Sequence, residues 1–177
     1  MNTLRAGSTR LEPLLAGHAA EMFSVLSDPA IYEFENEPPA SPAVLRQRFE
    51  MLESRASPDQ SEQWLNWVIR LPSGELAGYI QATVLAQGSG YVAYELASRF
   101  WRRGIATAAV GSVLSELATR YAVRDAFAVL KAANYRSRGL LSKLGFAALP
   151  AAQQAPWPAE PDELVMRKSI APSESAA

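Results

Sequence analysis

The sequence predicts an α+β fold, with one mixed α/β sheet that is mostly antiparallel, has about six to seven strands and carries helices on both faces. The chain has 177 residues, which suits one domain with a single core. Two alternating apolar segments, 64–71 and 75–85, flank a Pro-Ser-Gly break, a pattern typical of a hairpin. After residue 91, strand-like and helix-like segments alternate, which indicates a central parallel pair of strands.

Periodicity and breaker residues place the individual elements. Helices with apolar residues on one side are expected at 18–26, 42–54, 105–121 and 134–144. Ser41 and Pro42 form a good helix start, and the last helix has Asn134 as its cap and Gly145 after its end. Strands are expected at 10–14, 64–71, 75–85, 91–97, 124–130, 146–149 and 164–170.

No repeat or linker divides the chain, so we expect a single domain over residues 8–170. The small and polar segment 171–177 indicates a disordered C-terminal tail.

The composition excludes several classes of protein. The formal net charge of -1 lacks the basic excess of a nucleic-acid-binding protein. The chain has no cysteine, which excludes disulfides, thiolate metal sites and a cysteine nucleophile. Residues 1–10 lack the apolar centre of a signal peptide, and no apolar run is long enough to cross a bilayer. We therefore expect a cytoplasmic protein with no nucleic acid, no membrane and no metal among its partners.

The most informative segment is residues 101–106, Trp-Arg-Arg-Gly-Ile-Ala, at a strand-to-helix junction. Gly104 lets a ligand approach the backbone, and the first N–H groups of the following helix have no partner within the helix. Together with the helix dipole they favour a phosphate. The segment lacks the Gly-Lys-Ser/Thr ending of a P-loop and the further glycines of a dinucleotide fingerprint. By itself it fits a phosphate site and a plain helix start equally well.

A second segment favours the phosphate site over the plain helix start. Residues 134–137 read Asn-Tyr-Arg-Ser, and residues 143–146 read Lys-Leu-Gly-Phe. Together with Gly104 and Ala106 this resembles the acetyl-CoA-binding core of the GCN5-related N-acetyltransferases (GNAT). In that family a Gln/Arg-x-x-Gly-x-Gly/Ala turn precedes a helix, a strand and an Asn-x-x-Ser helix that ends in Gly-Phe.

Trp101 stands where this pattern has Gln or Arg. A Trp there resembles the RimJ/RimL branch, which includes enzymes that acetylate the N-termini of ribosomal proteins. Residues 10–14 and the Ser-Asp-Pro at 27–29 are also similar to that branch. The resemblance covers residues 10–170 and is most specific over 91–146.

The resemblance implies a GNAT-type domain whose central parallel strands are splayed, and an activity that moves an acetyl group from acetyl-CoA to a primary amine. Transfer would be direct, in a ternary complex. The acceptor would be a small molecule or a peptide, including a protein N-terminal α-amine, and the protein a monomer or homodimer. The residues that would hold acetyl-CoA are Leu96, Ala97, Arg102, Arg103, Gly104, Ile105, Ala106, Thr107, Asn134 and Ser137. A backbone N–H near Leu96 would stabilise the oxyanion.

The acceptor amine must lose a proton before it attacks, because an alkyl ammonium has a pKa of about 10 and an α-amine of about 8. Glu95 is the first candidate for the base, since it lies in an otherwise apolar strand. An equal alternative is that Glu95 lies on the solvent-exposed face of that strand. Glu33 and Glu35 are the second candidates for the base, on a loop expected to cover the acceptor site. Alternatively they would attract a cationic acceptor or remain solvated.

The chain departs from the family at the proton donor for the leaving thiolate. Many members have a Tyr seven positions after the Asn, and here that position is Leu141. Ser137, Tyr135 or water would have to supply the proton. The missing Tyr also leaves open a catalytically silent acyl-CoA-binding module of the same fold.

Overall fold

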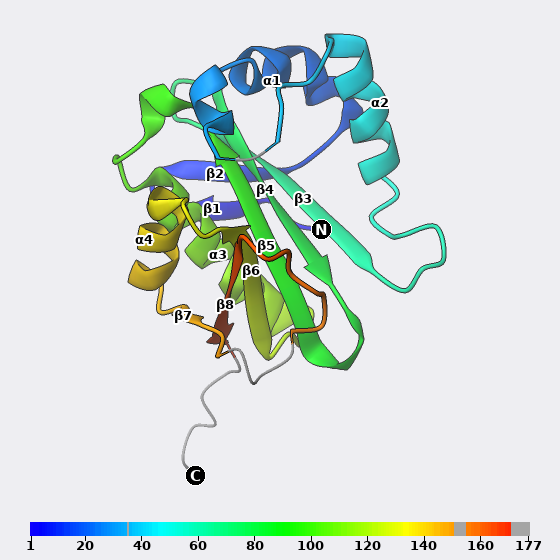
Figure 1. Cartoon of the computed structure of the whole chain (residues 1–177). Coiled ribbons are helices and arrows are strands. Elements are labelled where there is room, and N and C mark those ends of the chain that lie inside the picture. Colours follow the sequence, from blue (N-terminus) through cyan, green and yellow to red (C-terminus); the bar gives the residue numbers. More distant parts are fainter. Residues whose placement is uncertain (35, 151–154, 171–177) are drawn as a thin grey trace.

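The structure is a computed structural model that describes residues 1–34, 36–150 and 155–170. Within these residues one eight-stranded sheet has the order β1-β2-β3-β4-β5-β6-β8-β7 (Figure 1). The strands are β1 Leu4–Ala6, β2 Thr9–Pro13, β3 Gln63–Arg70, β4 Leu76–Val84, β5 Ser89–Leu96, β6 Asp125–Lys131, β7 Ala147–Ala148 and β8 Glu163–Ser169. The expected tail, residues 171–177, lies outside the described part of the chain.

The sheet is antiparallel except for its central pair, β5 and β6, which run parallel. The predicted fold class is therefore confirmed, with eight strands in place of the six to seven expected. The additional strand is β1, which lies ahead of residue 8 and pairs with β2. It has three residues, too few for an alternating pattern to be recognised in the sequence.

Helices cover both faces of the sheet. The helices α1 (Ala19–Leu26) and α2 (Pro42–Leu52) contact β4 and β3, whereas α3 (Ile105–Arg120) packs behind β1, β2, β4 and β5 (Figure 1). The fourth helix, α4 (Tyr135–Lys143), lies beside the open end of β5 and β6 (Figure 1). Burial of nearly every residue of β4 agrees with this arrangement, because only a strand covered on both faces excludes water from both.

The helices occur where the sequence predicts them. Ser41 caps α2, since its hydroxyl accepts the Val44 N–H at 3.2 Å, and Pro42 occupies the first helical position. The large buried side chains Trp67 and Phe49 fill the core. No helix in the described ranges has the length and apolar content needed to cross a bilayer.

Candidate active site

The central parallel strands part halfway along their length. The pairing of β5 with β6 extends only from Ser89 with Asp125 to Tyr91 with Phe127, although β5 continues to Leu96 and β6 to Lys131. Beyond Tyr91 the two strands no longer pair with each other, and a gap separates their facing backbone edges. The splayed pair that the sequence predicts is therefore present, and its gap opens toward the start of α3.

The free edge of β5 can be assigned from the alternation of an antiparallel ladder. The Ala97 N–H donates to the Ala77 carbonyl of the β4 side at 2.9 Å. Residues at odd positions of β5, including Glu95, therefore direct their backbone groups to β4, and Tyr94 and Leu96 direct theirs to the gap. The Leu96 carbonyl accepts the indole N–H of Trp101 at 2.7 Å, which agrees with this direction.

The turn before α3 has the geometry of an anion site. Arg102 and Gly104 both have positive φ, of 59° and 77°. The first helical hydrogen bond runs from the Ala108 N–H to the Gly104 carbonyl at 3.0 Å, so the N–H groups of residues 105–107 have no acceptor within the helix. A Cβ placed on Gly104 would meet nothing within 4 Å. The turn thus presents converging amides to open space, as expected of a phosphate cradle.

The turn and the gap belong to one cavity of about 800 Å³. Most of the residues expected to hold the cofactor or carry the chemistry line it: Glu95, Leu96, Arg102, Gly104, Ile105, Ala106, Thr107, Asn134 and Ser137. Ala97 and Arg103 do not line it. The Ala97 N–H is taken up by the sheet, and the Arg103 guanidinium lies 5.7 Å from the centre of the Phe100 ring.

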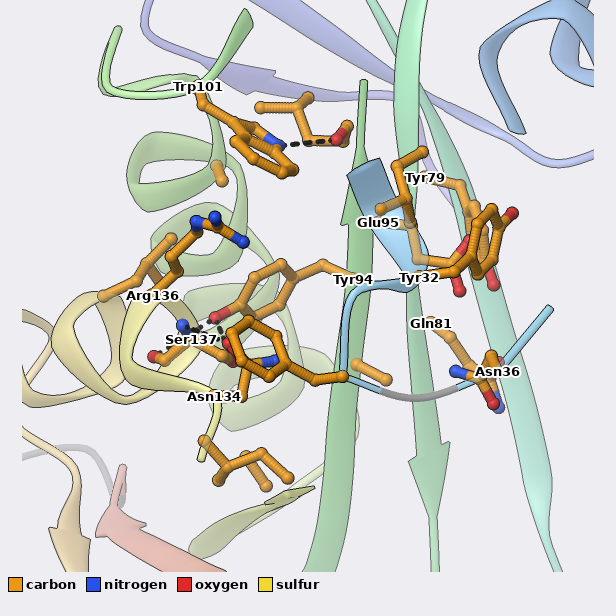
Figure 2. Close-up of a pocket in the computed structure, with 18 of the residues that line it drawn as sticks. Tyr32, Asn36, Tyr79, Gln81, Tyr94, Glu95, Trp101, Asn134, Arg136 and Ser137 are labelled. Carbon is orange, nitrogen blue, oxygen red and sulfur yellow. Dashed lines mark hydrogen bonds between the residues drawn. The ribbon is translucent and has the colours of Figure 1, made fainter. Parts of the chain in front are cut away.

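Glu95 lies on the side of β5 that faces α1 and α2. Figure 2 shows it grouped with Tyr32 and Tyr79, and Tyr79 stands directly opposite it on β4. Burial raises the pKa of both tyrosines, and the Glu95 carboxylate raises it further. Both hydroxyls stay protonated at neutral pH, and that of Tyr32 donates to the Leu26 carbonyl at 2.8 Å. Glu95 thus borders the cavity and is only partly exposed.

Ser137 lies on α4, across the gap from β5. The Asn134 carboxamide oxygen accepts the Ser137 N–H at 3.0 Å, which confirms Asn134 as the helix cap. The Ser137 hydroxyl lies 2.8 Å from the Tyr94 hydroxyl (Figure 2). Burial raises the pKa of Tyr94 to about 12. Leu141, at the position of the family tyrosine, is 1% exposed and belongs to the core.

The loop before α2 is tied to α4. The carboxylate of Glu33 pairs with the Arg136 guanidinium at 2.5 Å. Arg136 also lies over the ring of Trp101, 4.7 Å from its centre, and over that of Phe34, at 5.5 Å. Glu33 does not line the cavity. Its ion pair with Arg136 holds this loop against α4. Glu35, the other expected acceptor residue, lies outside the described residues.

Asp28 forms a second anchor that the sequence did not assign. Its carboxylate accepts the N–H of Ser98 at 2.7 Å and that of Ala30 at 3.1 Å. Burial alone would raise the pKa of Asp28, but these hydrogen bonds lower it below its ordinary value. Asp28 thereby joins the loop on the Glu95 side of the cavity to the segment that leads into the phosphate turn.

The comparisons with known proteins agree with this geometry. Residues 9–147 match the family described as the acetyltransferase (GNAT) domain. The chain belongs to the GNAT acetyltransferase family. Among curated proteins the sequence finds no match.

Solved GNAT structures share the fold at low identity. Mycobacterium smegmatis RimJ, in complex with CoA-disulfide, has 23% identity and a TM-score of 0.73 over 95% of this chain and 86% of its own. The ribosomal-protein-S5-alanine acetyltransferase of Vibrio fischeri has 16% identity and a TM-score of 0.74 over 96% and 97%. The microcin C7 self-immunity acetyltransferase MccE, in complex with acetyl-CoA and AMP, has 15% identity and a TM-score of 0.76 over 92% and 93%. RimJ is thus among the GNAT neighbours of this chain.

Proposed function

We propose that this GNAT protein transfers an acetyl group from acetyl-CoA to a primary amine by direct attack in a ternary complex. One observation carries the proposal: a single cavity joins an open anion turn, an unpaired strand edge and a carboxylate. Acetyl-CoA combines a pyrophosphate, an amide-bearing arm and a thioester, and these match the three features in order. Its thioester carbon is the centre that an amine attacks.

The residues of the cavity fit this co-substrate. The amides of residues 105–107 would receive the pyrophosphate, and Arg102 adds positive charge at the same rim. The backbone of Tyr94 and Leu96, which faces the gap, offers the amides of the arm the pairing that β6 does not provide. The Leu96 N–H is the donor for the oxyanion, because the alternation of the ladder directs it into the gap and not to β4. Asn134 and Ser137 border the gap from α4.

Glu95 takes the role of base on the acceptor side. It would accept the proton that the ammonium group of the acceptor loses, directly or through a water molecule. Ser137 takes the role of donor to the leaving thiolate on the opposite side of β5. The two roles are thus separated by the strand, with the amine approaching from the α1 and α2 side and the thiol leaving on the α4 side.

The acceptor class proposed first is a protein N-terminal α-amine, supported by the ribosomal-protein acetyltransferase among the neighbours. Small amines are the second class. A RimJ/RimL-like assignment, a cytoplasmic location and a monomeric or dimeric state remain predictions from the sequence.

The test is release of the CoA thiol with a panel of N-terminal peptides and small amines, together with calorimetric titration of acetyl-CoA. Turnover with at least one acceptor supports the proposal. Absence of acetyl-CoA binding at millimolar concentration would overturn it. A second candidate, an acyl-CoA-binding module without turnover, is favoured by the buried Leu141 at the tyrosine position. Binding without turnover across the whole panel would establish that alternative.

A further inference from the structure

We propose that Tyr94 is a positioning residue, whose hydroxyl donates to the Ser137 oxygen and thereby directs the Ser137 proton at the leaving thiolate. This proposal rests on the proposed function. It assigns a role to a residue of β5 that the sequence pattern presents only as part of an apolar strand. It also supplies the phenol that is missing at position 141 of α4.

The geometry places the two hydroxyls in contact across the gap. Tyr94 extends from β5 toward α4, and its oxygen lies 2.8 Å from the Ser137 hydroxyl oxygen but 3.5 Å from the Ser137 carbonyl oxygen (Figure 2). The shorter distance identifies the side-chain oxygen as the main partner. Both residues line the cavity, so the pair stands where the arm of the co-substrate would pass.

At this distance either hydroxyl could donate, and the proposal assigns Tyr94 as the donor. A hydroxyl has one proton to donate and two lone pairs that accept. If Tyr94 donates to Ser137, one lone pair of the serine is occupied and its own proton is left for the sulfur. The Ser137 backbone is held by the Asn134 cap, so the remaining freedom of the serine is rotation of its side chain and hydroxyl. The tyrosine restricts that rotation.

Tyr94 remains a donor throughout the working pH range. Burial raises its pKa to about 12, so the phenol is protonated under all conditions in which a GNAT assay is run. A serine hydroxyl alone is a poor acid toward a thiolate, whose conjugate acid has a pKa of about 8.5. A hydrogen bond from the phenol makes the serine proton easier to release, because it stabilises the negative charge that develops on the serine oxygen.

The step balances when written in full. The amine nitrogen forms a bond to the thioester carbon, the carbon–sulfur bond breaks, and its electron pair goes to sulfur. The Ser137 proton moves to sulfur, and the Ser137 oxygen, held by the hydrogen bond from Tyr94, regains a proton from solvent. The ammonium of the acceptor has meanwhile lost two protons to solvent, the first by way of Glu95 or water before attack and the second from the nitrogen once it has bonded to the carbon. The products are an amide, a thiol and one proton released to solvent.

The two other candidate positions on α4, 141 and 135, do not bring a phenol to Ser137. Leu141 is 1% exposed and packs in the core, so the inner side of α4 offers no hydroxyl one turn beyond Ser137. Tyr135, which the sequence offered as an alternative donor, is 52% exposed and meets the Phe34 ring edge-on. Tyr94 is therefore the tyrosine that contacts Ser137.

The experiment is a double-mutant cycle of Tyr94→Phe, Ser137→Ala and the combined variant, assayed with acetyl-CoA and the best acceptor. We expect Tyr94→Phe to lower kcat about tenfold and leave the KM for acetyl-CoA within about twofold. In the Ser137→Ala background the same change should have little further effect, because its partner is absent. Tyr121→Phe, at the far end of α3, is the matched control and should retain wild-type kcat.

The outcomes separate the two proposals. A wild-type protein without any turnover refutes the proposed function itself. With an active wild type, a Tyr94→Phe kcat equal to wild type overturns the role of Tyr94 alone. An effect confined to the KM for acetyl-CoA, or losses that simply multiply in the double variant, would likewise overturn it, since either indicates a packing role. Thermal melting of every variant identifies a loss of kcat that comes from misfolding, and kcat is compared at a temperature at which all four proteins of the cycle are folded.

Discussion

Gly78 of β4 stands so close to Glu95 of β5 that a Cβ on the glycine would lie 2.0 Å from the Glu95 carbonyl oxygen. The same atom would lie 2.9 Å from the Leu96 Cα. The backbones of the two strands therefore leave no room for a side chain on β4 at the residues assigned to the base and the oxyanion. A glycine at this position sets the placement of both, because any side chain would push β5 toward the gap.

We expect Gly78→Ala to destabilise the protein by about 1–3 kcal/mol, as overpacking of a tight site does. It should also lower kcat, since the displaced atoms belong to Glu95 and Leu96. Urea unfolding and steady-state kinetics measure the two effects. Gly139→Ala is the matched control: nothing lies within 4 Å of its Cβ, and an exposed helical glycine gains up to about 1 kcal/mol on this change. Equal stability of the two variants would contradict the close approach.

We expect Gly104→Glu to abolish acetyl-CoA binding, because it places a carboxylate where the pyrophosphate would lie. Backbone strain also contributes, since the position has a φ of 77°. Gly74→Glu controls for both strain and charge, because Gly74 has a φ of 94° and open space within 4 Å, in the turn between β3 and β4. Calorimetry should show binding by the Gly74 variant and at least a hundredfold loss in the Gly104 variant, about 2.7 kcal/mol. Equal affinities would remove the pyrophosphate turn from the proposal.

The sequence predicted those parts of the site that local backbone geometry determines. Gly104 and Asn134 each meet a requirement within a few residues, a positive φ before a helix and a cap for a helical N–H. Tyr94 and Asp28 have partners 43 and 70 residues away along the chain, and no local pattern shows which residues the fold brings to them. For the same reason no local pattern shows that Glu33 pairs with Arg136 on α4.

Asp28 should make stability depend on pH. Its folded-state pKa is lowered by the hydrogen bonds from Ser98 and Ala30, so its contribution is present above the unfolded pKa of about 3.9 and is lost as the pH falls through the folded value. We expect Asp28→Ala to cost about 1–2 kcal/mol near neutral pH, and the difference from wild type to shrink below about pH 4. Urea unfolding at several pH values measures it. Glu50→Ala, which removes an exposed pair with Arg46, should cost at most about 0.5 kcal/mol. A pH-independent loss would show that Asp28 acts through packing alone.

The role of Glu95 can be tested by the pH dependence of Glu95→Gln. A general base matters most when the acceptor is protonated, so the loss of kcat/KM should be largest well below the acceptor pKa, about 8 for an α-amine. We expect a loss of about a hundredfold near pH 6 that falls below about tenfold near pH 9, where the amine is already neutral. The amide keeps the size of the carboxylate, so the pocket of Tyr32 and Tyr79 stays filled. Glu50→Gln, on the exposed side of α2, should follow the wild-type profile. A loss that is the same at every pH would show that Glu95 positions the acceptor electrostatically and that water takes its proton.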